Sequence, residues 1–373
     1  MSGEALIIGG GISGTATAVK LARGGFDVTL VEREDEWRAL GHGITMIGPA
    51  LRALQSLELL DEALESGYGV TELRFCSPAG TVVQELALPR LLGPDRPGLL
   101  GMMRPRLHEI LARAAAAAGV QARTGTSPTT IGDSGDRVTV ALDDDTAGAY
   151  DVVVVADGLF SSTRALLGWD DTPQFVGQGV FRAVLDRVED VTCSYQFVGH
   201  PSAKAGFTPT GPDSMYMFCT VPANRDEHIA REDLPQRLCE ALSDFGGIVA
   251  EAREQITDPA LLDFRLEEWL ILKQPWNRGR VVVLGDAAHA TTPHLAAGAA
   301  MCLEDAIVLG EELADSSDVA DSLDRFAERR RPRCERVVRS SVQLAEWELA
   351  PDTPGADPAG FTMEASAFLA QPF

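Results

Sequence analysis

The 373-residue sequence is poor in lysine, which occurs only at Lys20, Lys204 and Lys273, so arginine carries nearly all of its positive charge. The 32 lysines and arginines stand against 55 aspartates and glutamates, and the net charge is −23. Because a chain this acidic repels polyanions, we expect neither nucleic acid nor an anionic membrane surface as a partner. An anionic small molecule could bind only through a local cationic pocket.

Long apolar runs and paired cysteines are also missing. No run approaches the ~20 apolar residues of a membrane span, and a strand-like run at residues 5–8 leaves no room for a signal peptide. The six cysteines are scattered without a C-x-x-C pair, which predicts reduced, mostly buried thiols. We therefore expect a cytoplasmic protein without a metal site or disulfides.

The first strand–helix–strand unit contains a glycine loop. Gly9, Gly11 and Gly14 fit the pattern G-x-G-x-x-G, which permits a tight turn, the approach of a pyrophosphate and close helix–strand packing. Glu32 ends the second strand, where an acid binds the ribose hydroxyls and disfavours a 2′-phosphate. The sequence therefore predicts bound FAD or NAD rather than NADP. The neighbouring Arg33 could stack on an adenine or be solvated.

Two more strand ends carry an aspartate. A run of four valines leads into Ala156-Asp157-Gly158, and a second valine-rich strand leads into Gly285-Asp286. Open α/β sheets bind ligands at this edge, although an aspartate there is also a common helix cap. Together with the glycine loop, the two aspartates favour one extended cofactor.

Doubly wound patterns at both ends of the chain enclose a β-rich middle, which predicts an α/β fold with an inserted domain. We expect one helix at 49–66 and a solvated helix face at Arg329-Arg330-Arg331. The tail could be disordered or lie along the surface or a partner subunit. The predicted boundaries are 1–72, 98–172 and 275–315 for the nucleotide-binding domain, 73–97 and 173–274 for the substrate-binding β-sheet domain, 316–350 for a C-terminal helix, and 351–373 for an extended tail.

The ordered segments resemble the fingerprints of class A FAD-dependent monooxygenases of the p-hydroxybenzoate hydroxylase and salicylate hydroxylase type. The resemblance covers residues 4–345 and includes Gly285-Asp286-Ala287-Ala288-His289 followed by Glu304-Asp305-Ala306. It implies a Rossmann-like, glutathione-reductase-type FAD-binding domain with an inserted mixed β-sheet substrate domain and C-terminal helices. His289 is expected to be structural.

The resemblance also implies which residues contact FAD. Glu32 would bind the adenosine ribose, Arg104 the phosphate or ribitol side, and Asp286 the ribitol. The family often has Gly-Gln-Gly-x-Asn where this chain has Ala296-Ala297-Gly298-Ala299-Ala300, so side-chain contacts from Gln and Asn are missing. The full set of cofactor-binding residues predicted in this way is Gly9, Gly11, Ser13, Gly14, Glu32, Arg33, Gly43, Arg104, Asp157, Gly285, Asp286, Pro293, Gly298, Ala299 and Ala300.

The activity implied is hydroxylation of a small phenolic or aromatic acid substrate with NADH or NADPH and O2, through a flavin C4a-hydroperoxide and without a metal, by a monomer or homodimer. His294 is a candidate base, or else a loop histidine bonded to the backbone. Lys204, Arg182 and Tyr216 would face the substrate, or else form surface pairs with acids. The alternatives are a related flavoprotein epoxidase, oxidative decarboxylase or isoprenoid reductase, and a non-catalytic FAD-binding protein.

Overall fold

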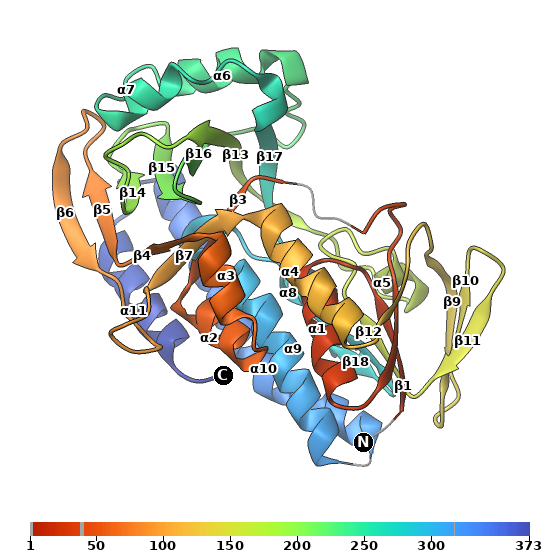
Figure 1. Ribbon diagram of the computed structural model, residues 1–373. Helices are drawn as coiled ribbons and strands as arrows, with labels where there is room; N and C mark the ends of the chain where they lie inside the picture. The colour runs from red at the N-terminus through yellow and green to blue at the C-terminus, as the bar shows by residue number, and fades with distance from the viewer. Residues whose placement is uncertain (1–2, 38–40, 317) are drawn as a thin grey trace.

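The computed structural model describes residues 3–37, 41–316 and 318–373. Two large β-sheets dominate the molecule, a parallel sheet in the lower half of Figure 1 and a mostly antiparallel sheet in the upper half. Each sheet has its own hydrophobic core. Among the residues described, no helix is long and apolar enough to cross a membrane.

The lower sheet has six strands, and all of its pairings are parallel except that of the edge strand β18. Apart from the exposed Glu4 at the start of one of them, its central strands are apolar on both faces and buried, as expected of a parallel sheet. Helix α1 (Ile12–Arg23) packs against both α4 (Arg104–Ala117) and α9 (Gly298–Asp315) beside this sheet (Figure 1). The strands in spatial order are β18 (Asn277–Arg278), β19 (Val281–Val283), β12 (Val152–Val155), β1 (Glu4–Ile8), β2 (Asp27–Val31) and β8 (Gln121–Arg123).

Two three-stranded antiparallel sheets accompany the two large sheets, and neither was expected from the sequence. In one, β10 directs alternate apolar side chains, Val138, Val140 and Leu142, into the same core as β1 and β12. The other small sheet contacts the upper sheet. The strands are β9 (Pro128–Asp133), β10 (Val138–Leu142) and β11 (Ala147–Tyr150), and β3 (Gly43–Ile47), β4 (Tyr68–Val70) and β7 (Leu99–Met103).

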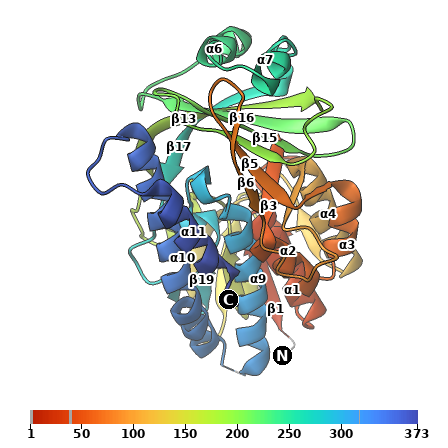
Figure 2. The same ribbon diagram turned by 90° about the vertical axis from the view of Figure 1, so that its left-hand side faces the viewer.

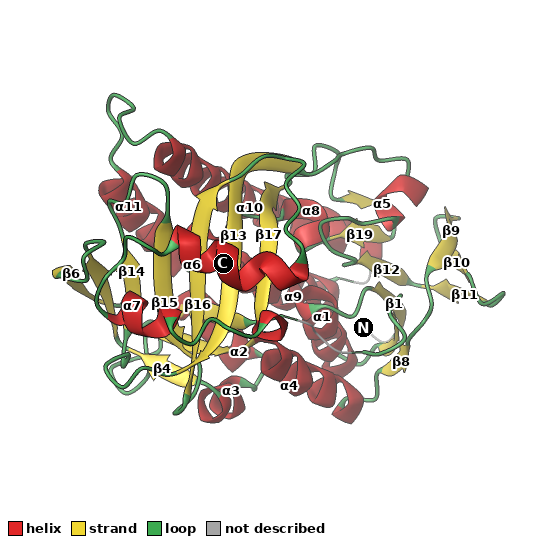
Figure 3. Cartoon of the chain, turned by 90° about the horizontal axis from the view of Figure 1, so that it is seen from above, coloured by secondary structure: helices red, strands yellow, loops and turns green. Residues whose placement is uncertain are grey.

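The upper sheet has seven strands, antiparallel except where β14 pairs with β5. Helices α6 (Leu234–Ala241) and α7 (Ile248–Arg253) cover its outer face (Figures 2 and 3). A parallel sheet with packed helices, joined to a mixed sheet, confirms the predicted fold class. The strands in spatial order are β17 (Leu262–Trp269), β13 (Gln174–Asp186), β16 (Ser214–Pro222), β15 (Lys204–Pro209), β14 (Ser194–Phe197), β5 (Glu72–Cys76) and β6 (Val82–Ala87).

The C-terminal region contains two helices. Helix α10 (Val319–Leu349) runs through Pro332 without ending. The segment predicted to be an extended tail instead contains α11 (Pro358–Ala370), which begins at a proline and is capped by the Asp357 side chain. Its apolar residues Ala365 and Leu369 pack into the lower core, which explains why this segment is ordered against the protein.

The single helix expected at 49–66 is wrong, because the chain forms α2 (Gly48–Ser56) and α3 (Leu60–Ser66). Between them Glu58 adopts a left-handed conformation with φ of 55°. The turn lets Leu57 and Leu59 both enter the core, which a continuous helix would not allow.

Candidate active site

The three fingerprint segments meet at one edge of the lower sheet. Ile8 pairs with Val155, and Val155 pairs with Val283, so β1, β12 and β19 end side by side. Gly9 has φ of 104°, and a Cβ placed on it would lie 2.5 Å from the carbonyl oxygen of Ala156. The segments after the three strands therefore form one continuous surface.

The glycine loop combines a tight turn with an open approach. A Cβ on Gly14 would lie 1.9 Å from the carbonyl oxygen of Gly9, so only glycine allows α1 to start here. A Cβ on Gly11 would meet nothing within 4 Å. Gly11 is also the residue before α1, and no side chain caps that helix. The first N–H groups of α1 are thus available to an anionic group approaching over Gly11.

Glu32 is fixed against the glycine loop. Its carboxylate accepts hydrogen bonds from the backbone N–H of Gly10 at 2.7 Å and of Glu34 at 3.0 Å. The carbonyl of Gly10 accepts from Nε1 of Trp37 at 3.0 Å and bonds Nε2 of His108 at 2.7 Å. Sequence reasoning missed Trp37 and His108, because no local pattern connects them to the loop.

The second fingerprint is held by its own short helix, α5 (Thr163–Leu166). Asp157 accepts a hydrogen bond from the backbone N–H of Thr163 at 3.1 Å. Arg164 is buried and donates to the carbonyl oxygens of Leu159 at 2.6 Å and Ala287 at 2.8 Å. Arg164 therefore ties the second fingerprint to the third.

The third fingerprint forms α8 (Asp286–His289) and rests on Asp305 of α9. The Asp305 carboxylate accepts from the backbone N–H of Gly285 at 2.9 Å, bonds His289 Nε2 at 2.6 Å and accepts from Arg330 Nε at 2.7 Å. Burial opposes the charged form of Asp305, but His289 and Arg330 hold its pKa down at about 2. As expected, His289 is structural.

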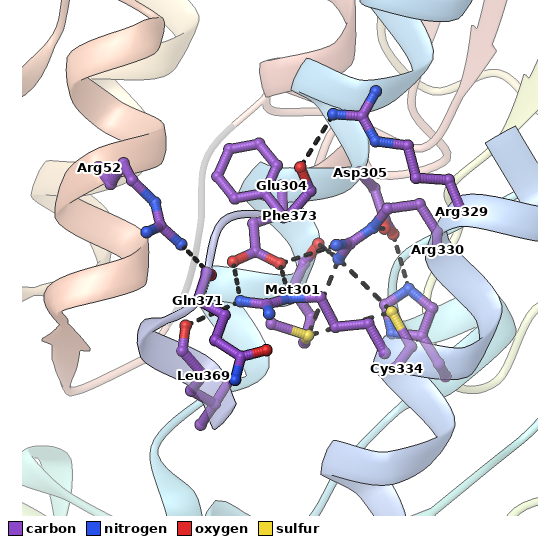
Figure 4. A network of polar contacts seen from close by, with 12 residues as sticks. Arg52, Met301, Glu304, Asp305, Arg329, Arg330, Cys334, Leu369, Gln371 and Phe373 are labelled. Carbon is purple, nitrogen blue, oxygen red and sulfur yellow. Dashed lines mark hydrogen bonds and ion pairs between the residues drawn. The ribbon is translucent and has the colours of Figure 1, made fainter. Parts of the chain in front are cut away.

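The network around Asp305 extends to the C-terminus (Figure 4). Arg333 binds both oxygens of Glu304 at 2.8 Å and the carbonyl oxygen of Leu369 at 2.9 Å. His289, Asp305 and Cys334 have the spacing of metal ligands. However, Arg330 already donates to Asp305 and to the Cys334 sulfur at 3.5 Å, so a guanidinium supplies the positive charge there.

In the upper sheet, Tyr216 packs against Gly43. A Cβ on Gly43 would lie 2.2 Å from Cβ of Tyr216, so the start of β3 touches strand β16 of the upper sheet at this glycine. Burial raises the pKa of Tyr216, and the neighbouring Arg182 opposes this rise. Arg182 and Tyr216 lie on the paired strands β13 and β16, and both are half-buried.

His294 and Lys204 meet at a shared carboxylate that sequence reasoning missed. Glu348, near the end of α10, accepts from Lys204 Nζ at 2.6 Å and bonds His294 Nε2 at 3.2 Å. His294 lies in the turn η3 (Pro293–Leu295), and its Nδ1 bonds Thr292 Oγ1 at 3.0 Å. Although burial opposes it, Lys204 and His294 lower the pKa of Glu348 to about 2.

The remaining residues predicted to bind the cofactor are Arg33, Arg104 and four residues between 293 and 300. The Arg33 side chain is 66% exposed and pairs with Glu34, which favours the solvated alternative. Arg104 starts α4, and its backbone N–H donates to the carbonyl oxygen of His42 at 2.9 Å. Pro293 begins η3, and Gly298, Ala299 and Ala300 form the first turn of α9, which begins after two intervening residues.

Two buried polar atoms at the strand ends fit a bound dinucleotide. Ser13 Oγ and Asp157 Oδ1 are both buried, and neither has a hydrogen-bond partner among the residues described. A ligand lying over Gly11 toward the third fingerprint would supply such partners. The residues present therefore fit an elongated cofactor such as FAD.

Comparison with known proteins agrees with this geometry. A family model described as "FAD binding domain" matches residues 3–341. The 2-heptyl-3-hydroxy-4(1H)-quinolone synthase of Pseudomonas aeruginosa is 35% identical over 92% of this chain and 90% of its own. The putative FAD-dependent monooxygenase YetM of Bacillus subtilis is 30% identical over 94% and 95%. The 3-hydroxybenzoate 6-hydroxylase of Klebsiella oxytoca is 29% identical over 91% and 87%.

Among solved structures, Klebsiella pneumoniae HpxO complexed with FAD and uric acid superposes with a TM-score of 0.84. The two proteins are 23% identical, and the match covers 98% of this chain and 92% of HpxO. This likeness supports the fold, while the family model and the curated relatives bear on activity. The chain belongs to the FAD-binding class A flavin monooxygenases and is an FAD-dependent enzyme of that family.

Proposed function

We propose that this monooxygenase uses NADH or NADPH and O2 to hydroxylate a small aromatic ring held between the start of α9 and the upper sheet. The observation that carries the proposal is the cluster of Lys204, Glu267, His294 and Glu348. It joins η3, which precedes α9, to strands β15 and β17 of the upper sheet and to α10. A ring bound against η3 would lie beside titratable groups and beside the segment predicted to contact the flavin.

FAD, when bound, supplies the redox chemistry and the activation of O2. The protein would hold it by the glycine loop at the pyrophosphate and by Asp286 on the ribitol side. In the structure Glu32 is already bonded to the N–H groups of Gly10 and Glu34, so its proposed ribose contact would use the remaining lone pairs of the carboxylate. Asp157 would use its unpartnered Oδ1.

His294 is the proposed base. Glu348 is ionised at working pH, because its pKa is about 2. Its carboxylate can therefore accept a hydrogen bond from His294 when Nε2 carries the imidazole proton. That tautomer leaves Nδ1, 3.8 Å from Glu267, as the basic nitrogen. We propose that Nδ1 takes the proton from a ring hydroxyl or enol, which makes the ring more electron-rich for hydroxylation.

The names of two relatives indicate two types of aromatic ring as candidate substrates. One is a 4(1H)-quinolone and the other a hydroxybenzoate. The higher identity, 35% against 29%, favours the quinolone type. The sequence analysis expected a small phenolic or aromatic acid substrate, and these relatives support a heteroaromatic ring as the proposed substrate instead.

We also propose a cellular compartment and an oligomeric state. All six cysteines are free, and five of them are buried, which supports action in the reducing cytoplasm. A monomer or a homodimer is proposed, and size-exclusion chromatography with light scattering would distinguish them.

The test uses FAD-loaded protein with NADH or NADPH and a panel of quinolones and phenolic acids. We expect one ring type to accelerate NAD(P)H oxidation and to yield a product with one added oxygen. Failure of the protein to bind FAD, or of every ring to give a hydroxylated product, would overturn the proposal.

A further inference from the structure

We propose that Glu267 and Gln178 form a subsite of hydrogen-bond acceptors that selects a neutral ring bearing an N–H donor, of the 4(1H)-quinolone class, and rejects aromatic carboxylates. This inference rests on the proposed function and specifies its substrate.

The first observation is an unpartnered buried carboxylate. Glu267 is only 4% exposed, and neither of its oxygens has a hydrogen-bond partner among the residues described. Nδ1 of His294 lies 3.8 Å from one of its oxygens, which is too far for a hydrogen bond. Burial raises the pKa of Glu267, and the charges of Arg182 and Lys204 oppose this rise. A hydrogen-bond donor from outside the protein would stabilise the charged carboxylate further, so such a donor is expected to complete the site.

The second observation is a β-bulge opposite this residue. Phe175 pairs with Glu268, and Gly179 pairs with Leu266, so residues 176–178 of β13 face Glu267 alone. Gly177 within the bulge has φ of 95°, which favours glycine. Bulges commonly redirect side chains next to active sites.

Gln178, the last residue of this bulge, adds a third unpartnered acceptor. It is 4% exposed, its Nε2 donates to Glu348 at 3.4 Å, and its Oε1 is buried without a partner. The subsite thus has three acceptor atoms that need donors. A ligand with N–H or O–H groups satisfies them, whereas a ligand with only acceptors does not.

The cations near the subsite are already engaged. Lys204 is bound to Glu348, and the charge of Arg182 acts on Glu267, so the two carboxylates already balance the two cations. A benzoate-type substrate would bring a second negative charge toward Glu267 without a free cation among the described residues of the cluster. Charge therefore favours the neutral N–H heteroaromatic over the aromatic acid.

The test measures dissociation constants by fluorescence titration of the FAD-loaded protein with three probes: 2-heptyl-4(1H)-quinolone, its N-methyl derivative and 3-hydroxybenzoate. The wild type should bind the N–H quinolone about 10- to 100-fold more tightly than the N-methyl compound. Glu267→Gln should reduce that ratio to about threefold or less and should improve binding of 3-hydroxybenzoate. Glu268→Gln, on the adjacent residue, should behave as the wild type.

Three results would overturn the subsite: a wild type that binds neither quinolone, one that prefers 3-hydroxybenzoate, or a Glu267→Gln variant that keeps the wild-type ratio. If any of these occurs while another ring is hydroxylated, the proposed function stands and only the subsite fails. Should Glu267→Gln not fold, Gln178→Leu removes one acceptor and should weaken N–H quinolone binding alone.

Discussion

Arg330 donates its Nε–H to Asp305 at 2.7 Å, and both side chains are fully buried. The contact joins α10 to α9, and through Asp305 it supports the backbone of Gly285. An ion pair formed 25 residues apart in the sequence thus holds the third fingerprint in place. Removing one partner of such a pair leaves an uncompensated buried charge.

Arg330→Met should therefore lower the free energy of unfolding by about 3–5 kcal/mol and should weaken FAD retention. Denaturant unfolding and flavin absorbance measure the two effects. The matched control is Arg329→Gln, because Arg329 is partly exposed and its contacts, with Glu311, Glu312 and the carbonyl oxygen of Phe373, leave no buried charge behind when it is replaced. That change should cost less than about 1 kcal/mol. Equal stabilities of the two variants would contradict the structural role of Arg330.

Two glycines of the loop should respond differently to substitution. Gly14→Ala forces a Cβ against the carbonyl oxygen of Gly9, so the variant should melt at a lower temperature. Gly11→Val places its side chain in open space, so the fold should persist while FAD binding is lost. Thermal melts by circular dichroism and the absorbance of bound flavin separate the outcomes. A Gly11→Val protein that retains FAD would argue against a pyrophosphate over Gly11.

His294→Gln should reduce hydroxylated product by about 100-fold or more, because general-base catalysis contributes on that scale. NAD(P)H oxidation should continue and release more peroxide per turnover. Chromatography of the product and a peroxide assay give both quantities. His228→Gln, an exposed histidine beside Glu227 and Arg237, is the control and should leave product formation unchanged. If the His294→Gln variant forms as much product per NAD(P)H oxidised as the wild type does, His294 is not the base.

The lowered pKa of Glu348 predicts that the free energy of unfolding depends on pH. Its pKa falls from 4.5 to about 2 on folding, so its ionised form stabilises the folded state above pH 4.5. That contribution should be lost as the pH falls from 4.5 to about 2. The stability difference between wild type and Glu348→Gln, measured by urea unfolding at several pH values, should shrink over this interval. A difference that is constant down to pH 2 would contradict the coupling of Glu348 to Lys204 and His294.

The fold and the cofactor edge could be predicted because their signals are local. Gly9, Gly14 and Glu32 carry the signature of a strand–helix–strand unit within 24 residues of chain. Asp157 and Asp286 each follow a run of buried valines. The convergence of these strand ends then follows from the geometry of parallel sheets.

The remaining features depend on contacts between distant segments. Arg330 lies in a run of three arginines that predicts a solvated face, which is wrong for Arg330 because Glu304 and Asp305 of another helix bury it. Glu267 and Glu348 have no local pattern, since only the packing of β17 and α10 around η3 brings them to His294. These residues could be identified only from the tertiary structure.

The most direct test of the account is isotopic. FAD-loaded protein is given NAD(P)H, 2-heptyl-4(1H)-quinolone and ¹⁸O2, and the product is analysed by mass spectrometry. We predict a hydroxylated quinolone that carries one ¹⁸O atom, with its yield dependent on His294. Oxidation of NAD(P)H without oxygen insertion into any ring, or a hydroxyl oxygen derived from water, would contradict it.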